Sequence, residues 1–512
     1  MHSRWYLAAL VLLFAAYGAL YARTVHYEHV WRDVPGLTEN PIYEGPWLAG
    51  LSASQEGYGP VAYLSHRLDR ELYGESPAGH HAHSVVLGAL ALALVLTLAR
   101  RWLRDDRKAL AVAAVFALHP LQVESIAYVS ARGDLLAALF ALAALALALR
   151  GADQSARRWP WVLLSSAAWL LSLLSSDTYI GLPLALLLIG WSMGRPRAHL
   201  VDVCAHGVAL AVYLALRSSS VPPTGGHADL AAMLVLPGLW LQYFSIALVP
   251  SDLSIVRPLT ALWIVPGWLA VLVISLGIGF ASRAALGIKT RLMRVALAGA
   301  SLALVLIGPS AMLAKATGVV ADRHACLPLV GYAVAVISAG HWLAVVAPAA
   351  LRPLHLLAAG LASAFLIATA LQIPVWVDAK MLYLNALMIE RSSSDAAYGL
   401  GLAHVREGNW SFALPYFVQA VDLDPQNAKA WNNIAAGALQ QGDYGRAIVA
   451  AKRAAAATSS PFRSLHNLAI AHLMLGETRE GCDALARALE HDPSSRDVRD
   501  QITVHCGAQS PK

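Results

Sequence analysis

The sequence predicts an all-α protein: a polytopic helical membrane domain followed by an α-solenoid of short repeats. Hydrophobic residues make up 57% of the 512-residue chain and charged residues 14%, whereas soluble domains carry about 25% charged residues. The long apolar segments end near Trp376, and Gly408, Gly442 and Gly476 then stand 34 residues apart, which is the tetratricopeptide period. We therefore expect a membrane domain over 1–375, a connecting segment over 376–395, and three repeats with a capping helix over 396–506.

Apolar segments that approach the roughly 20 residues of a helical span occur eleven times. They lie near 5–22, 84–100, 108–119, 134–150, 159–175, 178–193, 199–217, 261–281, 294–313, 328–347 and 353–374. The apolar segment 230–249 contains Pro237 and is followed by Pro250. Since irregular backbone survives at membrane depth only where protein or a cavity surrounds it, we interpret this segment as a re-entrant or interfacial helix.

Basic residues indicate the orientation. Arginine and lysine cluster at 100–108, 150–158, 195–197 and 283–294, and short loops rich in these residues face the cytoplasm. The N-terminus is then inside, while the loop 23–83 and everything after 374 are outside. The net charge of +6 is spread over such loops and does not indicate a nucleic-acid partner. Spans dominated by alanine and leucine favour a bacterial inner membrane with periplasmic repeats, or an ER membrane with lumenal repeats in a eukaryote.

The repeat region indicates a protein partner, because concave repeat surfaces typically bind extended polypeptide. Leu400, Ala413, Phe417 and their counterparts in the next two repeats occupy the small and large positions of paired helices. Cys482 and Cys506 both lie in this region. They form a disulfide if the region faces an oxidising compartment, and two buried free thiols are the equally acceptable alternative.

Polar residues close to span ends on the outer side are the chemical evidence, because charge in a membrane is costly and usually functional. Glu28 follows the first span and can serve as a general base for a hydroxyl, although a solvated loop explains it equally well. The segment 119–134 is predicted to form a short helix between two spans, in which Glu124, Tyr128 and Arg132 are four residues apart and therefore share one face. That face would suit an anionic head group and a hydroxyl acceptor, unless the segment is only a structural connector.

Two further outer segments contain candidate ligands. Asp177 lies between two spans, and Asp322 and Arg323 precede another. An arginine at the outer surface suits phosphate because its planar fork donates two parallel hydrogen bonds, although it can also simply snorkel. Six histidines of the first outer loop, His81 among them, raise the hypothesis of a divalent metal, but their spacing fits no standard site. No metal ligands are therefore predicted.

Three stretches carry a resemblance to a known family. HPLQVESIAYVSARGDLLAALF (119–140), LLSLLSSDTYIGLPLALLL (170–188) and ADRHACLPLVGY (321–332) resemble segments of the transmembrane and tetratricopeptide repeat O-mannosyltransferases and their bacterial relatives. The resemblance extends over essentially the whole chain, repeats included. It implies the C-type (GT-C) glycosyltransferase fold, a sugar donor carried on polyprenyl phosphate, and an acceptor Ser or Thr hydroxyl deprotonated by an acid of the first outer loop.

The resemblance thus predicts a glycosyltransferase whose repeats bind the protein acceptor. Glu28 is the expected base, Glu124 positions a substrate, and Arg132 and Arg323 bind phosphate. The remaining predicted substrate-binding residues are His81, His119, Tyr128, Asp134, Asp177 and Asp322. No cofactor is predicted with certainty beyond the polyprenyl-phosphate sugar, and a divalent metal remains open. The alternatives are a non-catalytic membrane scaffold that recruits partners through its repeats, and a lipid-linked glycan polymerase or ligase.

Overall fold

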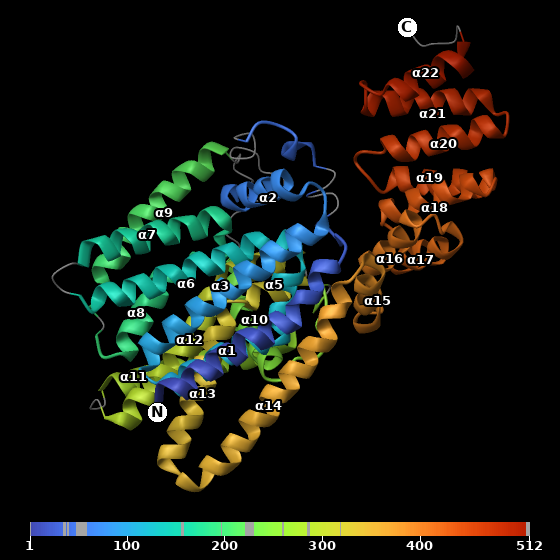
Figure 1. The fold of residues 1–512 in the computed structure, drawn as a ribbon. Coiled ribbons are helices and arrows are strands. Elements are labelled where there is room, and N and C mark those ends of the chain that lie inside the picture. Colours follow the sequence, from blue (N-terminus) through green and yellow to red (C-terminus); the bar gives the residue numbers. More distant parts are fainter. Residues whose placement is uncertain are drawn as a thin grey trace. The chain divides into compact units, whose positions relative to one another are not determined.

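The computed structural model describes residues 2–33, 37, 40–47, 59–154, 158–195, 197–220, 230–255, 257–258, 261–283, 287–317 and 319–507. It divides into two compact units, Met1–Asp378 and Ala379–Lys512, which we describe separately. Both units are helical (Figure 1). Parts of the first outer loop, residues 34–36, 38–39 and 48–58, lie outside the described residues.

Fourteen helices of the first unit are formed by described residues. They are α1 (His2–Tyr21), α2 (Pro60–Tyr73), α3 (Pro77–Leu103), α4 (Asp106–Leu118), α5 (Val123–Ala127), α6 (Arg132–Ala152), α7 (Arg158–Ser175), α8 (Leu182–Ser192), α9 (Leu200–Ser220), α10 (Leu230–Leu248), α11 (Ile264–Arg283), α12 (Ile288–Thr317), α13 (Pro328–Val346) and α14 (Leu351–Gln372). Two short strands, β1 (Arg257–Pro258) and β2 (Val319–Val320), pair antiparallel.

Each of the eleven predicted spans corresponds to a helix, which confirms the polytopic helical membrane domain. Among the described residues, however, eight helices are long and apolar enough to cross a membrane, or nine if the bent pair around His119 and Pro120 forms one span. The helices α4, α7 and α8 fall outside the eight. α4 has 13 residues and stops before Pro120, and α8 has 11 residues, both shorter than the roughly 20 that a bilayer requires. α7 begins with Arg158 and contains four serines.

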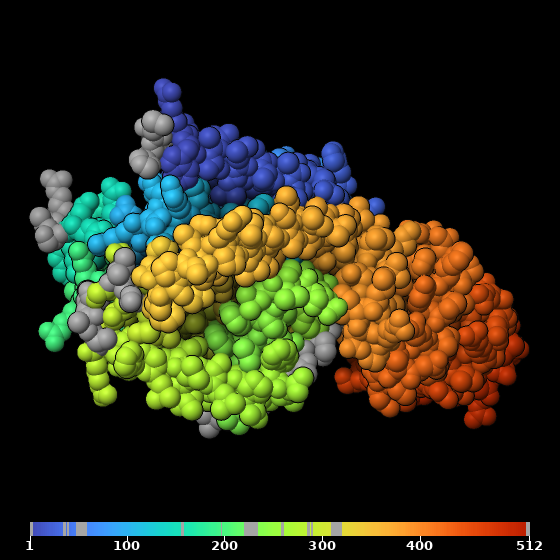
Figure 2. Space-filling view, turned by 90° about the horizontal axis from the view of Figure 1, so that it is seen from below, coloured from blue at the N-terminus to red at the C-terminus, as the bar shows by residue number. Residues whose placement is uncertain are grey.

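The longest apolar surfaces are exposed, as contact with lipid requires. Figure 2 shows α14, in gold, on the surface of this unit between the blue α1 and the green to yellow α10 and α11. Leu356, Leu357, Ile367 and Leu371 of α14 are all exposed. Apolar side chains on such a face replace contacts with water by contacts with lipid tails, so they need no protein partner.

α10, the predicted re-entrant or interfacial helix, contributes to the core of the unit. Its Leu239 and Tyr243 are fully buried and pack with Leu329 and Tyr332 of α13. The Tyr332 hydroxyl donates to the Trp240 carbonyl at 2.7 Å, and the Tyr243 hydroxyl donates to the Ala321 carbonyl at 2.5 Å. The second bond holds the segment before residue 322 in place, and the pairing of β1 with β2 fixes the same segment.

The second unit consists of paired helices, which confirms the predicted solenoid. After α15 (Ala379–Ile389), the pairs are α16 (Ser394–Arg406) with α17 (Trp410–Leu423), α18 (Ala428–Gln440) with α19 (Tyr444–Ala456), and α20 (Phe462–Met474) with α21 (Thr478–His491), followed by α22 (Arg496–His505). The turns of the three pairs contain Gly408, Gly442 and Gly476, with φ of 77°, 74° and 77°. Glycine recurs there because that backbone region penalises a Cβ atom.

The last helix of the solenoid is covalently attached. Cys482 in α21 and Cys506, which follows α22, form a disulfide with their Cα atoms 5.8 Å apart, inside the range that a disulfide permits. Of the two alternatives that the sequence left open for these cysteines, the structure contains the disulfide.

Candidate functional site

An ion-pair cluster centred on Arg323 joins three elements of the membrane unit. Arg323 lies in the 3₁₀ turn η10 (Asp322–Ala325), and its Nη1 donates to Glu124 Oε1 of α5 at 2.6 Å. Its Nε donates to Asp134 Oδ2, in the first turn of α6, at 3.1 Å. Burial lowers the pKa of the Arg323 guanidinium, but the two carboxylates outweigh burial and raise that pKa above its ordinary value. Arg323 is therefore a fixed, permanent cation.

The cluster extends from Asp134 toward Asp177. Asp134 Oδ1 accepts hydrogen bonds from the hydroxyls of Ser176 and Thr178, both at 2.9 Å. Asp177 begins the turn η8 (Asp177–Tyr179) and forms an ion pair with Arg217 at the end of α9. Since both side chains of this pair are about half exposed, solvent screening leaves it little energy of its own.

Asp322, next to Arg323 in the chain, has a different partner. Arg257 of β1 donates to both Asp322 oxygens, and its Nη2 also donates to the Asp252 carbonyl at 2.8 Å. Burial raises the pKa of the Asp322 carboxyl to about 6, while the Arg257 guanidinium opposes that shift. Asp322 thus anchors the turn that presents Arg323, through an arginine that the sequence analysis did not single out.

Three aromatic rings from distant segments are stacked beside Arg323. Tyr128 lies between Trp31 and Trp376, with ring centroids 5.2 Å and 5.5 Å away and interplanar angles of 28° in both pairs. The Arg323 guanidinium is 6.0 Å from the ring centroids of both Trp31 and Tyr128, within the range of cation–π attraction. Trp376 closes the turn η12 (Ile373–Trp376). The predicted substrate-binding residue Tyr128 therefore borders the charged cluster.

Glu28 and Asp33 of the first outer loop contact other parts of the membrane unit near this cluster in the sequence, at Val377 and Ser130. The Glu28 carboxylate is exposed, its backbone N–H donates to the Val377 carbonyl at 3.1 Å, and its carbonyl accepts from His81 Nε2 at 3.4 Å. Asp33 is buried, and its Oδ1 accepts from the backbone N–H and the hydroxyl of Ser130 at 2.7 Å and 2.5 Å. Burial raises the pKa of the Asp33 carboxyl to about 6. Asp33 holds the loop against the membrane unit, while Glu28 faces the solvent.

The predicted common face of Glu124, Tyr128 and Arg132 was wrong. α5 ends at Ala127, Tyr128 adopts an extended conformation with φ −88° and ψ 110°, and α6 begins at Arg132. The spacing of four residues places side chains on one face only within an uninterrupted helix. Glu124 and Tyr128 still border Arg323, but Arg132 belongs to a different set of contacts.

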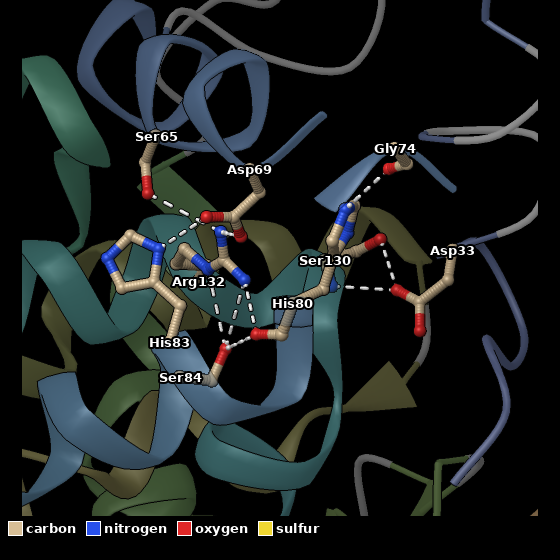
Figure 3. Close-up of polar contacts among 9 residues, drawn as sticks. All are labelled: Asp33, Ser65, Asp69, Gly74, His80, His83, Ser84, Ser130 and Arg132. Atoms are coloured by element: carbon tan, nitrogen blue, oxygen red, sulfur yellow. Dashed lines mark hydrogen bonds and ion pairs between the residues drawn. The ribbon is translucent and has the colours of Figure 1, made fainter. Parts of the chain in front are cut away.

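Arg132 is fully buried and forms an ion pair with Asp69 of α2 (Figure 3). Its Nη2 also donates to the His80 carbonyl at 2.7 Å, and Asp69 Oδ1 accepts from His83 Nδ1 at 2.6 Å. Burial raises the pKa of the Asp69 carboxyl, but His83 and Arg132 outweigh burial, so that the pKa lies below its ordinary value. Arg132 thus attaches α2 of the outer loop to α3 and α6, and its guanidinium is occupied by groups of the protein.

The two predicted histidines are also engaged with the backbone. His119 accepts from the Leu121 N–H at 3.1 Å through Nδ1, and its Nε2 donates to the Ala247 carbonyl at 3.0 Å. His81 is fully buried beside Glu28 and lies 6.4 Å from the His29 ring. Within the described part of the chain, no three or more His, Cys, Asp or Glu side chains are arranged to hold a metal ion.

Sequence reasoning missed Trp31, Asp69 and Arg257 as members of these contacts. Asp69 lies in a polar amphipathic helix, where a carboxylate is ordinary. Arg257 carried a usable signal, because it is a basic residue in a loop assigned to the outer side, against the usual bias of such loops. The sequence contains no comparable signal for Trp31, because the position of Trp31 depends on its stacking with Tyr128.

Comparisons with known proteins bear on the family resemblance. No family model matches the chain. A segment of 161 residues is 33% identical to the mouse protein O-mannosyl-transferase TMTC1, covering 28% of this chain and 17% of that protein. The fruit fly protein O-mannosyl-transferase Tmtc1 is 32% identical over 159 residues, 31% of this chain and 18% of its own length. The chain resembles the TMTC protein O-mannosyl-transferases.

The resemblance predicted from the motifs is thereby confirmed, within a segment that spans less than a fifth of the length of the TMTC proteins. The human protein O-mannosyl-transferase TMTC2 is 29% identical over 161 residues, 28% of this chain and 19% of that protein. Among solved structures, ArnT from Cupriavidus metallidurans bound to undecaprenyl phosphate covers 95% of this chain and 80% of its own, at 16% identity and a TM-score of 0.35. A TM-score this low places no constraint on the fold.

Proposed function

We propose that the protein is a multi-pass membrane glycosyltransferase of the C-type fold that transfers a sugar from polyprenyl phosphate to Ser or Thr hydroxyls of a protein. The observation that carries the proposal is the charged cluster in which Arg323 meets Glu124 and Asp134, with Tyr128 and Trp31 of the first outer loop stacked beside it. Charged groups assembled in this way beside a membrane are costly and mark functional sites. The TMTC proteins, which are named protein O-mannosyl-transferases, support the reaction class.

In the proposed transfer one bond forms, one bond breaks and one proton moves. The acceptor hydroxyl oxygen forms a bond to the anomeric carbon, the bond from that carbon to the phosphate oxygen breaks, and polyprenyl phosphate leaves with the electron pair. The hydroxyl proton passes to the Glu28 carboxylate. Glu28 is the suitable base because it is exposed to an acceptor arriving from water, whereas Glu124 is committed to Arg323.

Arg323 would stabilise the departing phosphate, which is the electrostatic contribution that group transfer needs most. Because Glu124 and Asp134 fix the guanidinium, little reorganisation is required when negative charge develops on the leaving group. Asp322 and Asp177 would hold the turns that carry the site, and Arg132, His81 and His119 would position neighbouring segments through their contacts with the protein. A divalent metal remains outside the proposal.

The repeats would bind the acceptor polypeptide, since paired helices of this kind present extended surfaces to peptides. We propose that the repeats and the loop 23–83 lie on the outer side of the membrane, in the periplasm of a bacterium or the lumen of the ER. The disulfide between Cys482 and Cys506 supports this side, because disulfides persist in oxidising compartments.

The test compares the intact masses of secreted proteins in cells with the wild-type gene, without it, and with Glu28→Gln. We expect wild-type cells to show one or more proteins heavier by whole sugar units, and Glu28→Gln cells to lose that addition while retaining the membrane protein. Glu44→Gln is the matched control, an exposed glutamate of the same loop that pairs with Arg70. Masses that are identical with and without the gene would favour the scaffold instead.

A further inference from the structure

Trp31 is the exceptional residue of the aromatic stack. It is a non-glycine residue with φ of 54°, a backbone conformation that costs about 1–3 kcal/mol and that persists mainly where function or surrounding structure demands it. Tyr128 and Trp376 are buried to 3% exposure, whereas Trp31 is only partly buried. The stack therefore has two internal members and one that is accessible from outside.

Attachment of the loop to the membrane unit does not rest on Trp31 alone. Asp33, two residues later, already joins the loop to Ser130 through two hydrogen bonds and accepts a third from the Val30 N–H at 3.2 Å. An additional anchor would gain most from full burial of its apolar surface. Trp31 instead keeps part of its indole open while maintaining a strained backbone.

Two guanidinium groups flank the Trp31 ring. The Arg32 guanidinium is 5.6 Å from the ring centroid and the Arg323 guanidinium is 6.0 Å from it. Arg32 is exposed, while Arg323 is fixed by Glu124 and Asp134. A flat apolar surface beside two cations matches a ligand that has both an apolar ring face and an anion.

We propose that Trp31 binds the sugar ring of a glycosyl phosphate lipid, with Arg32 and Arg323 as ligands of its phosphate. The identity of this ligand rests on the proposed function. Trp31 would be the residue that recognises the sugar part of the donor. The C–H face of a pyranose packs on an indole as other apolar faces do, and its hydroxyl edges are left to polar groups. Arginine is the residue best suited to the phosphate oxygens.

The experiment measures binding, so that it does not depend on transfer. The full-length protein in nanodiscs is titrated with mannosyl, glucosyl and galactosyl polyprenyl phosphate and with the same polyprenyl phosphate without sugar. For the sugar lipid that wild type prefers, we expect Trp31→Ala to weaken binding about tenfold, the effect of losing a stacking contact. Binding of the bare lipid should change little, and Trp31→Phe should restore most of the affinity.

Trp47→Ala is the matched control, because Trp47 is an exposed tryptophan of the same loop with the Arg67 guanidinium 5.5 Å from its ring, and it should bind as wild type does. Equal weakening for both kinds of lipid would overturn the proposal, since Trp31 would then only anchor the loop. Wild-type protein that prefers none of the sugar lipids to the bare lipid would overturn it as well. A sugar-specific loss without any modified protein would sustain Trp31 as the sugar ligand and count against transfer to protein.

Discussion

Asp33 links the charge of the first outer loop to the stability of the fold. Its carboxyl is buried, and its pKa rises from the ordinary value of 3.8 to about 6 because burial disfavours the charged form. The folded state therefore holds this proton more tightly than the unfolded state does. The protonated Asp33 carboxyl therefore contributes to the stability of the fold. This contribution is complete below pH 3.8 and is lost as the pH rises to about 6.

We predict that Asp33→Asn, which cannot ionise, removes this loss. The stability of the variant relative to wild type should rise by up to about 3 kcal/mol as the pH increases from 4 to 7, the equivalent of a shift of two pKa units. It should start from a lower value, because the amide Nδ2 cannot accept the hydrogen bond from the Val30 N–H. Thermal unfolding of both proteins in detergent at several pH values measures the difference in stability between them. The other titrating groups are common to both proteins, so their contributions cancel in this difference. Unfolding curves that stay parallel across this range would show that Asp33 is ionised throughout.

Arg323 is the second residue whose contacts predict a measurable effect. Its side chain is 19% exposed and that of Glu124 is 4% exposed, so Arg323→Ala leaves a buried carboxylate without its cation. Such a loss costs about 3 kcal/mol. We expect a clear fall in the midpoint of thermal unfolding, together with loss of the proposed sugar transfer. Arg195→Ala, which breaks an exposed pair with Asp153, should change the midpoint little, and an equal effect of the two variants would contradict the assignment.

The candidate site could be predicted from the sequence only in part, for a physical reason. Charged residues at span ends are conspicuous in an apolar chain, so Glu124, Asp134 and Arg323 were identifiable. Which acid meets which base depends on where a helix breaks, and the extended conformation at Tyr128 separates Arg132 from Glu124. Asp69, the partner of Arg132, lies 63 residues away in the chain, beyond the reach of any local pattern.

Among the elements, the repeats followed the sequence most closely. Their period rests on glycines that the backbone requires, and their helices pair locally, so the pattern and the fold depend on the same few positions. The spans were less certain, because apolar length identifies a membrane segment but not its ends. His119 and Pro120 end α4 after 13 residues, although the apolar sequence before them resembles the other spans.

The turn at Gly442 gives a prediction at this scale. Its φ of 74° disfavours a side chain, and Gly442→Ala should destabilise the α18–α19 pair by about 1 kcal/mol. Gly445 lies three residues later inside α19, where the nearest atom to an added Cβ is an Asp443 oxygen at 3.9 Å. Gly445→Ala should instead stabilise the helix by about 0.5 kcal/mol.

Hydrogen exchange of peptides from α18 and α19, measured on the full chain, tests both signs. We expect faster exchange in Gly442→Ala and slower exchange in Gly445→Ala. The two changes add the same methyl group within one turn of each other, so general effects of the substitution cannot produce opposite results. Slower exchange in both variants would mean that the turn accepts a side chain and that its glycine is incidental.

For the whole molecule, the deciding property is the side of the membrane on which the repeats fold. The disulfide joins Cys482 to Cys506, 24 residues apart, and closure of a loop of that size stabilises a fold by about 3 kcal/mol. In a reducing cytoplasm the two thiols would remain free and α22 would be attached by packing alone, chiefly through Val498. The state of these cysteines in the cell therefore reports the orientation of the chain.

We predict that a thiol-reactive polymer does not label Cys482 or Cys506 in protein taken directly from membranes. After reduction, the polymer should label both cysteines and add the mass of two polymer chains. Cys204→Ser and Cys326→Ser remove the two free cysteines and leave only this pair to react. In that background Cys482→Ser should give one reactive thiol without reduction and faster hydrogen exchange in α22. Two reactive thiols before reduction would place the repeats in the cytoplasm, where they could not deliver a polypeptide to a site on the outer side.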